Sequence, residues 1–167
     1  MDLLVDARGW ALWDGRRLRC ALGRRGVRAG KREGDGATPV GSWTMRRLLY
    51  RPDRIGAPAT RLAAAAIAPE DGWCDDPADP LYNRPVRLPY KARAEALWRE
   101  DHLYDLIVPL GYNDDPVVAG AGSAIFLHVA GPGYAPTEGC VALAGGDLLT
   151  VLSAADSGSR VIVSPPG

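Results

Sequence analysis

One histidine and one cysteine, in a chain with only two histidines and three cysteines, stand at the two ends of a single loop. His128 and Cys140 are twelve residues apart in the stretch SAIFLHVAGPGYAPTEGCVAL, and three glycines and two prolines lie between them. A loop of this composition can fold back and bring the two side chains together. An imidazole beside a thiol can accept its proton and stabilise the thiolate, which is the reactive nucleophile. The pair therefore indicates nucleophilic catalysis by cysteine.

The residues around this pair could supply the other groups that such a reaction needs. The second imidazole nitrogen needs a hydrogen-bond acceptor, for which any backbone carbonyl or carboxylate would serve. Gly139 removes a side chain directly before Cys140, so the backbone amides of both residues could point at a developing oxyanion. The spacing alone leaves another interpretation open, in which His128 is a buried residue of a strand and Cys140 a buried residue of a turn.

The other cysteines and the other histidine indicate no further reactive site. Cys74 follows a tryptophan in a loop and Cys20 alternates with leucines, so we expect structural roles for both. The odd number of cysteines argues against a disulfide framework. Zinc needs three or four ligands, and the only other histidine, His102, lies at the end of a charged segment. We therefore expect neither a metal site nor a cofactor.

Length and composition indicate one globular domain, residues 1–167, with a sizeable core. The hydrophobic fraction is 47%, and 20 basic residues balance 20 acidic ones, so neither nucleic acid nor a membrane surface is expected as the main partner. No run approaches the roughly 18 apolar residues of a membrane span. The start, MDLLVDARGWALWDG, lacks a signal-peptide pattern. As written, we expect a cytoplasmic monomer; a missing N-terminal segment would make the protein periplasmic.

A strand must position His128, and a fixed turn must position Cys140. The apolar pattern of the chain is that of a β protein. Residues 122–130, GSAIFLHVA, predict a strand with His128 on one face and Leu127 and Val129 on the other. Apolar residues alternate on both sides of the dipeptide DG at positions 14–15, which predicts a hairpin near the N-terminus.

Helices are few in this prediction. Residues 91–101, KARAEALWRED, favour a helix, and a second short helix begins near Asp147. Its apolar stripe comprises Leu148, Leu149, Val151 and Leu152. Residues 61–69 are ambiguous, because their alanines favour a helix while a proline closes the segment, and we expect an extended conformation. Residues 70–90 form a long irregular insert, a kind of loop that is often functional. We therefore predict a mainly β fold with a few short helices (α+β).

Three features in the right order resemble the catalytic domain of L,D-transpeptidases, the YkuD-type family of enzymes that cross-link peptidoglycan. That family has a histidine at the end of a strand, a glycine-rich loop and then S/T-x-G-C with an aliphatic residue, and this chain has IFLHVAGPGYAPTEGCVAL. Upstream, GDGATPVGSW is similar to the family's glycine-rich loop with T-P-x-G, and a helix follows the cysteine segment. The resemblance spans most of the chain and implies a YkuD-like β-sandwich with a Gly/Pro-rich catalytic loop.

The resemblance implies a role for each residue of the motif. Cys140 would be the nucleophile and His128 the general base, with the backbone carbonyl of Val129 orienting the imidazole. The amides of Gly139 and Cys140 would bind the oxyanion. In the family, the thiolate attacks a tetrapeptide stem of meso-diaminopimelate-type peptidoglycan, D-alanine leaves, and a thioester remains on the cysteine. An amine from a second stem then gives a 3→3 cross-link, and carbapenems acylate the same cysteine.

Two other functions stay open on the sequence. If water resolves the thioester, the enzyme is an L,D-carboxypeptidase that trims recycled tetrapeptides, which suits a cytoplasmic location. If the groove binds without turnover, the protein is a peptidoglycan-binding module, and the altered motif positions described next leave room for that interpretation. Transpeptidation is the commonest activity of the family, so we expect it first.

Two positions depart from the family pattern. Glu138 stands where the family commonly has histidine; left unpaired it would raise the pKa of the neighbouring thiol, so we expect it to point away or to pair with an arginine. Ala142 stands where the family commonly has an arginine that resembles a substrate-carboxylate ligand. Arg84, in LYNRPV, is our candidate replacement, because a guanidinium binds carboxylates in a bidentate manner. Arg84 could equally be an ordinary surface arginine.

Further substrate contacts are predicted in the insert and in the loop. Asp75 or Asp76 could pair with the free ammonium of diaminopimelate, or the two could form an ordinary turn. Tyr82 could form an apolar wall of the cleft or pack in the core. Tyr134 and Thr137 lie inside the catalytic loop and could line the cleft, although Tyr134 could instead anchor its own loop.

Overall fold

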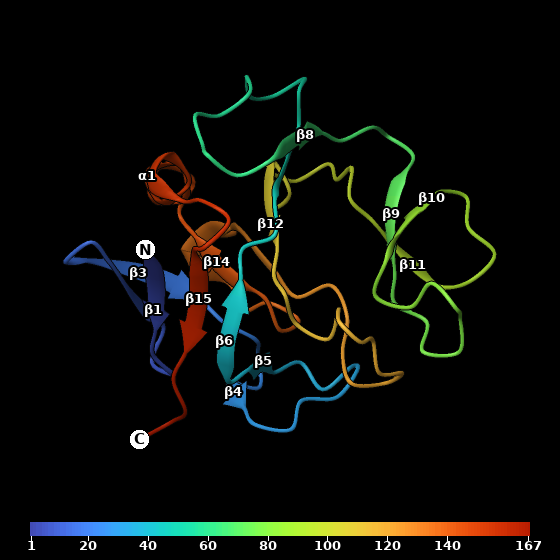
Figure 1. Ribbon diagram of the computed structural model, residues 1–167, viewed down its shortest axis with the longest axis horizontal. Coiled ribbons are helices and arrows are strands. Elements are labelled where there is room, and N and C mark those ends of the chain that lie inside the picture. The colour runs from blue at the N-terminus through green and yellow to red at the C-terminus, as the bar shows by residue number, and fades with distance from the viewer.

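One mixed sheet of ten strands curls around the main hydrophobic core (Figure 1). The structure is a computed structural model that describes residues 1–167. In spatial order the strands are β6 (Gly41–Thr44), β15 (Arg160–Val163), β1 (Asp2–Val5), β2 (Trp10–Trp13), β3 (Arg16–Ala21), β14 (Val141–Leu143), β13 (Phe126–Val129), β12 (Leu106–Pro109), β7 (Leu48–Tyr50) and β8 (Ala64–Ala66). The last strand of the chain, β15, pairs parallel with β1 and antiparallel with β6. The predicted β-rich α+β fold is confirmed.

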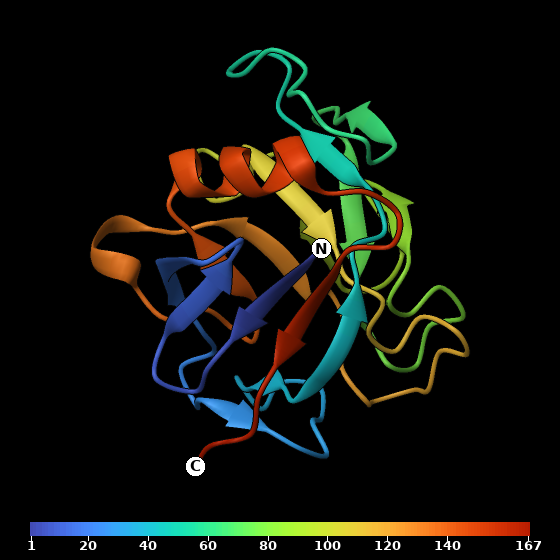
Figure 2. The same cartoon turned by 60° about the vertical axis from the view of Figure 1, so that its left-hand side comes forward.

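One face of the sheet carries the only α-helix, α1 (Gly145–Ala154), which packs beside β13 (Figure 2). Leu148, Val151 and Leu152 are fully buried against the strands, as the predicted apolar stripe requires. Leu149 belongs to that predicted stripe but is 38% exposed, because it lies at the edge of the helix face that the sheet covers. The helix therefore anchors the segment that directly follows the catalytic loop.

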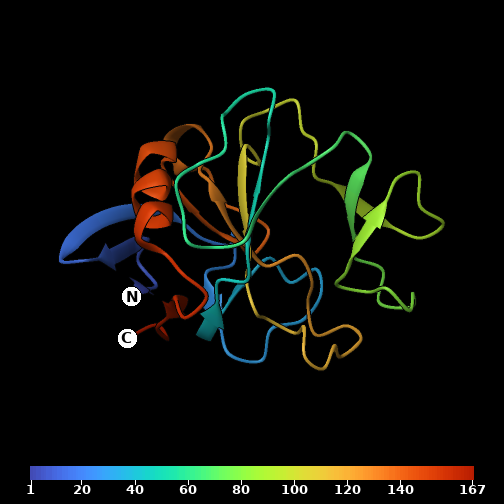
Figure 3. The same cartoon turned by 45° about the horizontal axis from the view of Figure 1, so that its top comes forward.

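A second, three-stranded sheet lies to one side of the large sheet, beyond β12 (Figures 1 and 3), and packs on the part of its other face that β7, β12 and β13 form. It consists of β10 (Pro85–Arg87), β9 (Asp71–Cys74) and β11 (Ala94–Ala96), with β9 in the middle, and we call it the β9–β11 sheet. A separate hydrophobic cluster, which includes Trp73 and Phe126, joins this small sheet to the large one. The edge-to-face contact of these two rings, 5.1 Å between centroids, lies at the centre of that junction.

The helix predicted over residues 91–101 is wrong, and the insert at 70–90 is more regular than predicted. Residues 94–96 form β11, which is hydrogen-bonded to β9 with Glu95 opposite Trp73. Strand pairing and the burial of Leu97 in the second cluster stabilise the extended form, and this tertiary effect outweighs the helix propensity of the alanines. Residues 61–69, in contrast, contain an extended strand, β8, as predicted.

Three short elements complete the fold in and beside the catalytic loop. Strand β4 (Val27–Arg28) pairs with β5 (Thr38–Pro39), which carries the T-P dipeptide of the upstream motif. The 3-10 helix η1 (Pro132–Tyr134) lies in the loop between β13 and β14. The one α-helix has ten residues, and no helix of the structure has the length and apolar character that a membrane span requires.

Candidate active site

Parallel pairing of β13 with β14 places His128 and Cys140 on the same face of the large sheet. His128 lies opposite Ala142 in the register, and Cys140 lies two residues before Ala142. Because side chains alternate along a strand, Cys140, Ala142 and His128 share one face, whereas Leu127 faces the helix side. This is the face that the β9–β11 sheet covers, so both functional side chains point into the space between the two sheets.

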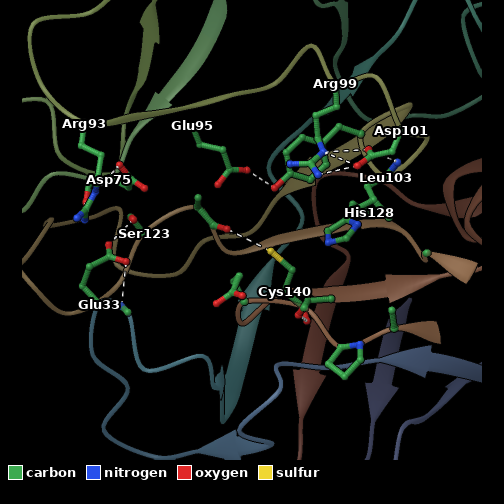
Figure 4. A pocket seen from close by; sticks show the side chains of 18 of the residues that line it. Glu33, Asp75, Arg93, Glu95, Arg99, Asp101, Leu103, Ser123, His128 and Cys140 are labelled. Carbon is green, nitrogen blue, oxygen red and sulfur yellow. Dashed lines mark hydrogen bonds and ion pairs between the residues drawn. The ribbon is translucent and has the colours of Figure 1, made fainter. Parts of the chain in front are cut away.

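That space is a cavity of about 620 Å³, and both His128 and Cys140 line it (Figure 4). The two close one end of it together with the catalytic loop, while polar side chains from the β9–β11 sheet and from the loop at Glu33 line the other end. A volume of this size suits a small peptide segment rather than a single small ion. The two ends of the loop therefore face one cavity, while both hydrogen bonds of the Cys140 sulfur go to backbone groups and none goes to His128.

A backbone carbonyl fixes the orientation of the histidine ring. His128 Nδ1 lies 2.9 Å from the carbonyl oxygen of Val129, so Nδ1–H donates to that oxygen and Nε2 is the nitrogen that can accept a proton. The ring also makes an edge-to-face contact with Tyr104, with 5.3 Å between the centroids. These two contacts hold the imidazole in one tautomer and one orientation. The hydrogen bond from the imidazole to the Val129 carbonyl is the one that the family resemblance implies.

The thiol of Cys140 is held by two backbone groups. Its Sγ–H donates to the carbonyl of Ala124 at 3.2 Å, and Sγ accepts a hydrogen bond from the Phe126 amide at 3.4 Å. Burial raises the pKa of this thiol from 9.0 to about 12, and burial lowers the pKa of His128 from 6.5 to about 4. Both groups are therefore neutral near pH 7. An imidazole that is neutral at rest is able to take the proton of a neutral thiol during attack, so this arrangement does not need a preformed thiolate.

The turn that presents Cys140 requires glycine at the position before it. Gly139 has a φ of +135°, and a Cβ there would lie 2.8 Å from the carbonyl oxygen of Ala37. The Gly139 amide donates to Thr137 Oγ1 at 3.1 Å, and that hydroxyl donates to the carbonyl of Cys140 at 2.8 Å. Thr137 therefore both lines the cavity and braces the turn. The amide of Cys140 makes no hydrogen bond in the protein, so it is the amide that remains for an oxyanion, whereas the Gly139 amide is already engaged.

Replacing Gly139 with alanine is expected to abolish turnover and to lower the free energy of unfolding by about 1–3 kcal/mol, because the new methyl group would push the turn away from Ala37. Denaturant unfolding and an acyl-transfer assay measure the two effects. Gly133→Ala is the matched control, because Gly133 has a φ of +64° in the same loop but an added Cβ would meet no atom within 4 Å. Equal activity of the two variants would contradict the steric argument.

Residues of the upstream motif form hydrogen bonds with the same turn. Thr38, which is fully buried, donates from Oγ1 to the carbonyl of Cys140 at 3.3 Å and accepts from the Gly23 amide at 2.9 Å. The buried Lys31 pairs with Asp35 at 2.8 Å, and its positive charge lowers the pKa of the Cys140 thiol, although burial has the larger effect. The sequence motif GDGATPVG contains Thr38, but the spacing of the motif did not predict the hydrogen bond between Thr38 and the carbonyl of Cys140.

The substrate contacts predicted from the insert lie elsewhere. The guanidinium of Arg84 donates to the carbonyl of Asp114 at 2.7 Å and lines a second cavity of about 350 Å³, not the cavity of Cys140. The Asp76 carboxylate accepts a hydrogen bond from the Ala78 amide at 3.0 Å. Asp76 therefore belongs to an ordinary turn, which is the alternative that the sequence left open. Asp75 lines the cavity of Cys140 but is paired with an arginine of the β9–β11 sheet.

The two tyrosines that were candidates to line the cleft have structural contacts instead. Tyr82 is buried, and its hydroxyl donates to Glu33 Oε1 at 2.7 Å and accepts from the Gly122 amide at 3.0 Å. The guanidinium carbon of Arg19 lies over the ring of Tyr134, 5.1 Å from the ring centroid. This contact corresponds to the alternative in which Tyr134 anchors its own loop. Neither tyrosine lines the cavity of Cys140.

The structure also accounts for the two departures from the family motif. Glu138 forms an ion pair with Arg24, as expected for a carboxylate next to a nucleophile. Ala142 is fully buried and does not line the cavity, so the position two residues after the cysteine has no access to a ligand. The only arginines that line the cavity are Arg93 and Arg99, which the sequence pattern did not single out.

Comparison with known proteins agrees with the architecture and with the position of the motif. The family model for YkuD, the L,D-transpeptidase catalytic domain, matches residues 4–163. Searches of curated proteins and of solved structures gave no match. The match covers both the upstream T-P-x-G segment and the segment from His128 to Cys140. The chain therefore belongs to the YkuD family of L,D-transpeptidase catalytic domains, whose members are cysteine enzymes that act on peptidoglycan.

Proposed function

We propose that the protein is an L,D-transpeptidase that forms a thioester on Cys140 with a tetrapeptide stem of peptidoglycan and passes the acyl group to an amine of a second stem. The observation that carries this proposal is the common placement of Cys140 and His128 in one cavity, with the His128 ring oriented by the Val129 carbonyl. A neutral thiol beside an oriented neutral imidazole is suited to nucleophilic attack with concerted proton removal.

The first half of the reaction uses three groups of the protein. The Cys140 sulfur attacks the carbonyl carbon between the diamino acid and the terminal D-alanine, while His128 Nε2 takes the proton from the thiol. The amide of Cys140 donates to the developing oxyanion. When the C–N bond breaks, the imidazolium gives its proton to the leaving amine, so D-alanine departs neutral at nitrogen and a thioester remains on the enzyme.

The second half reverses these roles. The amine of a second stem attacks the thioester carbonyl, His128 accepts a proton from that amine, and the imidazolium returns it to the departing sulfur. The product is a 3→3 cross-link, and the enzyme is restored with both groups neutral. If water attacks instead, the same steps release a tripeptide.

Product analysis on a purified disaccharide-tetrapeptide tests the proposal. Cross-linked dimers together with released D-alanine are the expected products. Tripeptides alone would show that water resolves the thioester and that the protein is an L,D-carboxypeptidase. Absence of any product, together with the absence of a carbapenem adduct on Cys140 by intact mass spectrometry, would contradict catalysis and support a binding module.

The pKa values of the pair predict the pH dependence of the first half-reaction. With the pKa of His128 at about 4, the imidazole stays neutral above that value, so kcat/KM is expected to be flat from about pH 6 to 9. As the pH falls through about 4, protonation of the imidazole removes the base and kcat/KM falls about tenfold per unit. The thiol, with a pKa of about 12, gives no alkaline limb in this range.

The measurement is the rate of D-alanine release at low substrate concentration against pH. Circular dichroism at each pH shows whether the protein is still folded, so a loss of rate caused by acid unfolding can be distinguished from one caused by protonation of His128. An alkaline limb at about pH 8 to 9 would contradict the neutral resting pair and would indicate a thiolate–imidazolium pair, whose activity is lost when the imidazolium gives up its proton. An acid limb between about pH 6 and 8 would contradict the lowered pKa of His128.

A further inference from the structure

From the charges in the cavity we infer that Glu95 is the residue that selects the acyl donor, by binding the free ammonium of the diamino acid whose carbonyl reacts with Cys140. The inference rests on the proposed function and assigns a specificity determinant within it. Strand pairing puts this residue in place: Glu95 lies opposite Trp73 in the β9–β11 sheet, and directly opposed residues of an antiparallel pair share one face. Since Trp73 packs on Phe126 of the large sheet, Glu95 points towards the same sheet and lines the cavity (Figure 4).

The Glu95 carboxylate has a neutral partner but no cationic one. Its Oε1 accepts a hydrogen bond from the Tyr104 hydroxyl, and its Oε2 accepts none. No fully buried side-chain oxygen or nitrogen of the chain lacks a hydrogen-bond partner, so Oε2 is not fully buried, and Glu95 lines the cavity. Burial raises the pKa of this carboxyl, because a charge shielded from water is unfavourable until a counter-charge arrives.

Neither arginine of the cavity forms an ion pair with Glu95, because each has its own carboxylate; burial raises the pKa of Glu95 by more than the charge of Arg99 lowers it. Arg93 pairs with Asp75 at 3.1 Å, and Arg99 pairs with Asp101 at 2.6 Å. Among the carboxylates that line the cavity, only Glu95 and Glu33 have no ion pair. Glu33 is saturated by two hydroxyls on Oε1 and a backbone amide on Oε2. Glu95 is therefore the one cavity carboxylate with both an unneutralised charge and an unoccupied oxygen.

Chemistry distinguishes the donor from the acceptor as the source of the ammonium. An acceptor amine must lose its proton to attack the thioester, and a carboxylate that held it as an ammonium would oppose that step. The side-chain ammonium of the donor takes no part in bond making and remains charged throughout. Glu95 and Cys140 line the same cavity, so the side chain of a diamino acid acylated on Cys140 can extend through that cavity towards Glu95.

The test measures acyl-enzyme formation alone, so that no acceptor is involved. Wild-type protein is mixed with a tetrapeptide stem that carries the diamino acid, or with the same peptide whose side chain lacks the amine, and D-alanine release is followed. The amine-bearing peptide is expected to have a kcat/KM about 10- to 100-fold higher, the range for a hydrogen bond to a charged group. In Glu95→Gln this preference is expected to fall to about twofold or less, with little change in kcat/KM for the peptide that lacks the amine.

Glu70→Gln is the matched control, because Glu70 pairs with Arg87 outside the cavity and should leave the preference intact. The comparison of two peptides on the wild-type protein needs no variant, so the inference can fail even if Glu95→Gln does not fold. Equal rates for the two peptides on wild-type protein, or an equal loss for both in folded Glu95→Gln, would overturn the inference and leave the proposed function standing. Failure of both peptides to acylate wild-type protein would overturn the proposed function and the inference with it.

Discussion

Replacing Cys140 with alanine should lower acyl transfer by about 10⁴-fold or more, because no other side chain in the cavity can form the thioester. The other thiols cannot substitute for it. Cys20 belongs to the main core on the helix side of the large sheet, and Cys74 is fully buried in β9. D-alanine release from a disaccharide-tetrapeptide measures the loss, and intact mass after incubation with a carbapenem gives a second readout.

Cys74→Ala is the control for this experiment. It removes a buried sulfur that does not line the cavity, so it is expected to cost some stability while the wild-type adduct and the products remain. Turnover by Cys140→Ala, or an adduct that persists in it, would show that another residue is the nucleophile.

Replacing His128 with asparagine should lower kcat/KM by about 10²- to 10⁴-fold at pH 7, the usual contribution of a general base. Asparagine is chosen because its amide nitrogen can reproduce the donor of Nδ1 towards the Val129 carbonyl, while no basic nitrogen remains. The thiol of the variant then has to be ionised by solvent. Its rate should therefore rise about tenfold per pH unit up to about pH 9, whereas the wild-type rate is flat.

This change in the shape of the pH profile separates a lost base from a disturbed fold. A merely structural role for His128 would lower the rate by the same factor at every pH. Because His128 is buried against Tyr104, urea unfolding of the variant should accompany the kinetics. Wild-type activity in a folded His128→Asn protein would contradict the assignment of the base.

The parts of the fold that local pattern determines could be predicted from the sequence. Alternation fixed the face of β13 on which His128 lies, and glycine and proline marked the loop that ends at Cys140. The apolar spacing also located α1 to within two residues of its observed start. These features depend on backbone periodicity and on turn residues, which act over a few positions of the chain.

The parts that depend on tertiary pairing could not be predicted in the same way. The segment around Glu95 has the composition of a helix, and only its hydrogen bonds with β9 make it a strand that faces the cavity. Arg84 was chosen as a carboxylate ligand by residue type, but its position beside Asp114 is set by the folding of two distant loops. The Gly139 amide was expected to be free, and the hydroxyl of Thr137, two residues away, occupies it.

Strand β15 follows all the other strands of the sheet in the sequence, yet it lies between β6 and β1 in the finished sheet. While residues 160–163 are still inside the exit tunnel, β1 and β6 each have an open edge where β15 will pair. Unpaired edges invite contacts with other chains, and long-range pairing of this kind forms slowly. The sheet therefore cannot be completed until β15 has left the ribosome, and we expect chaperones that shield those edges to assist folding up to that point.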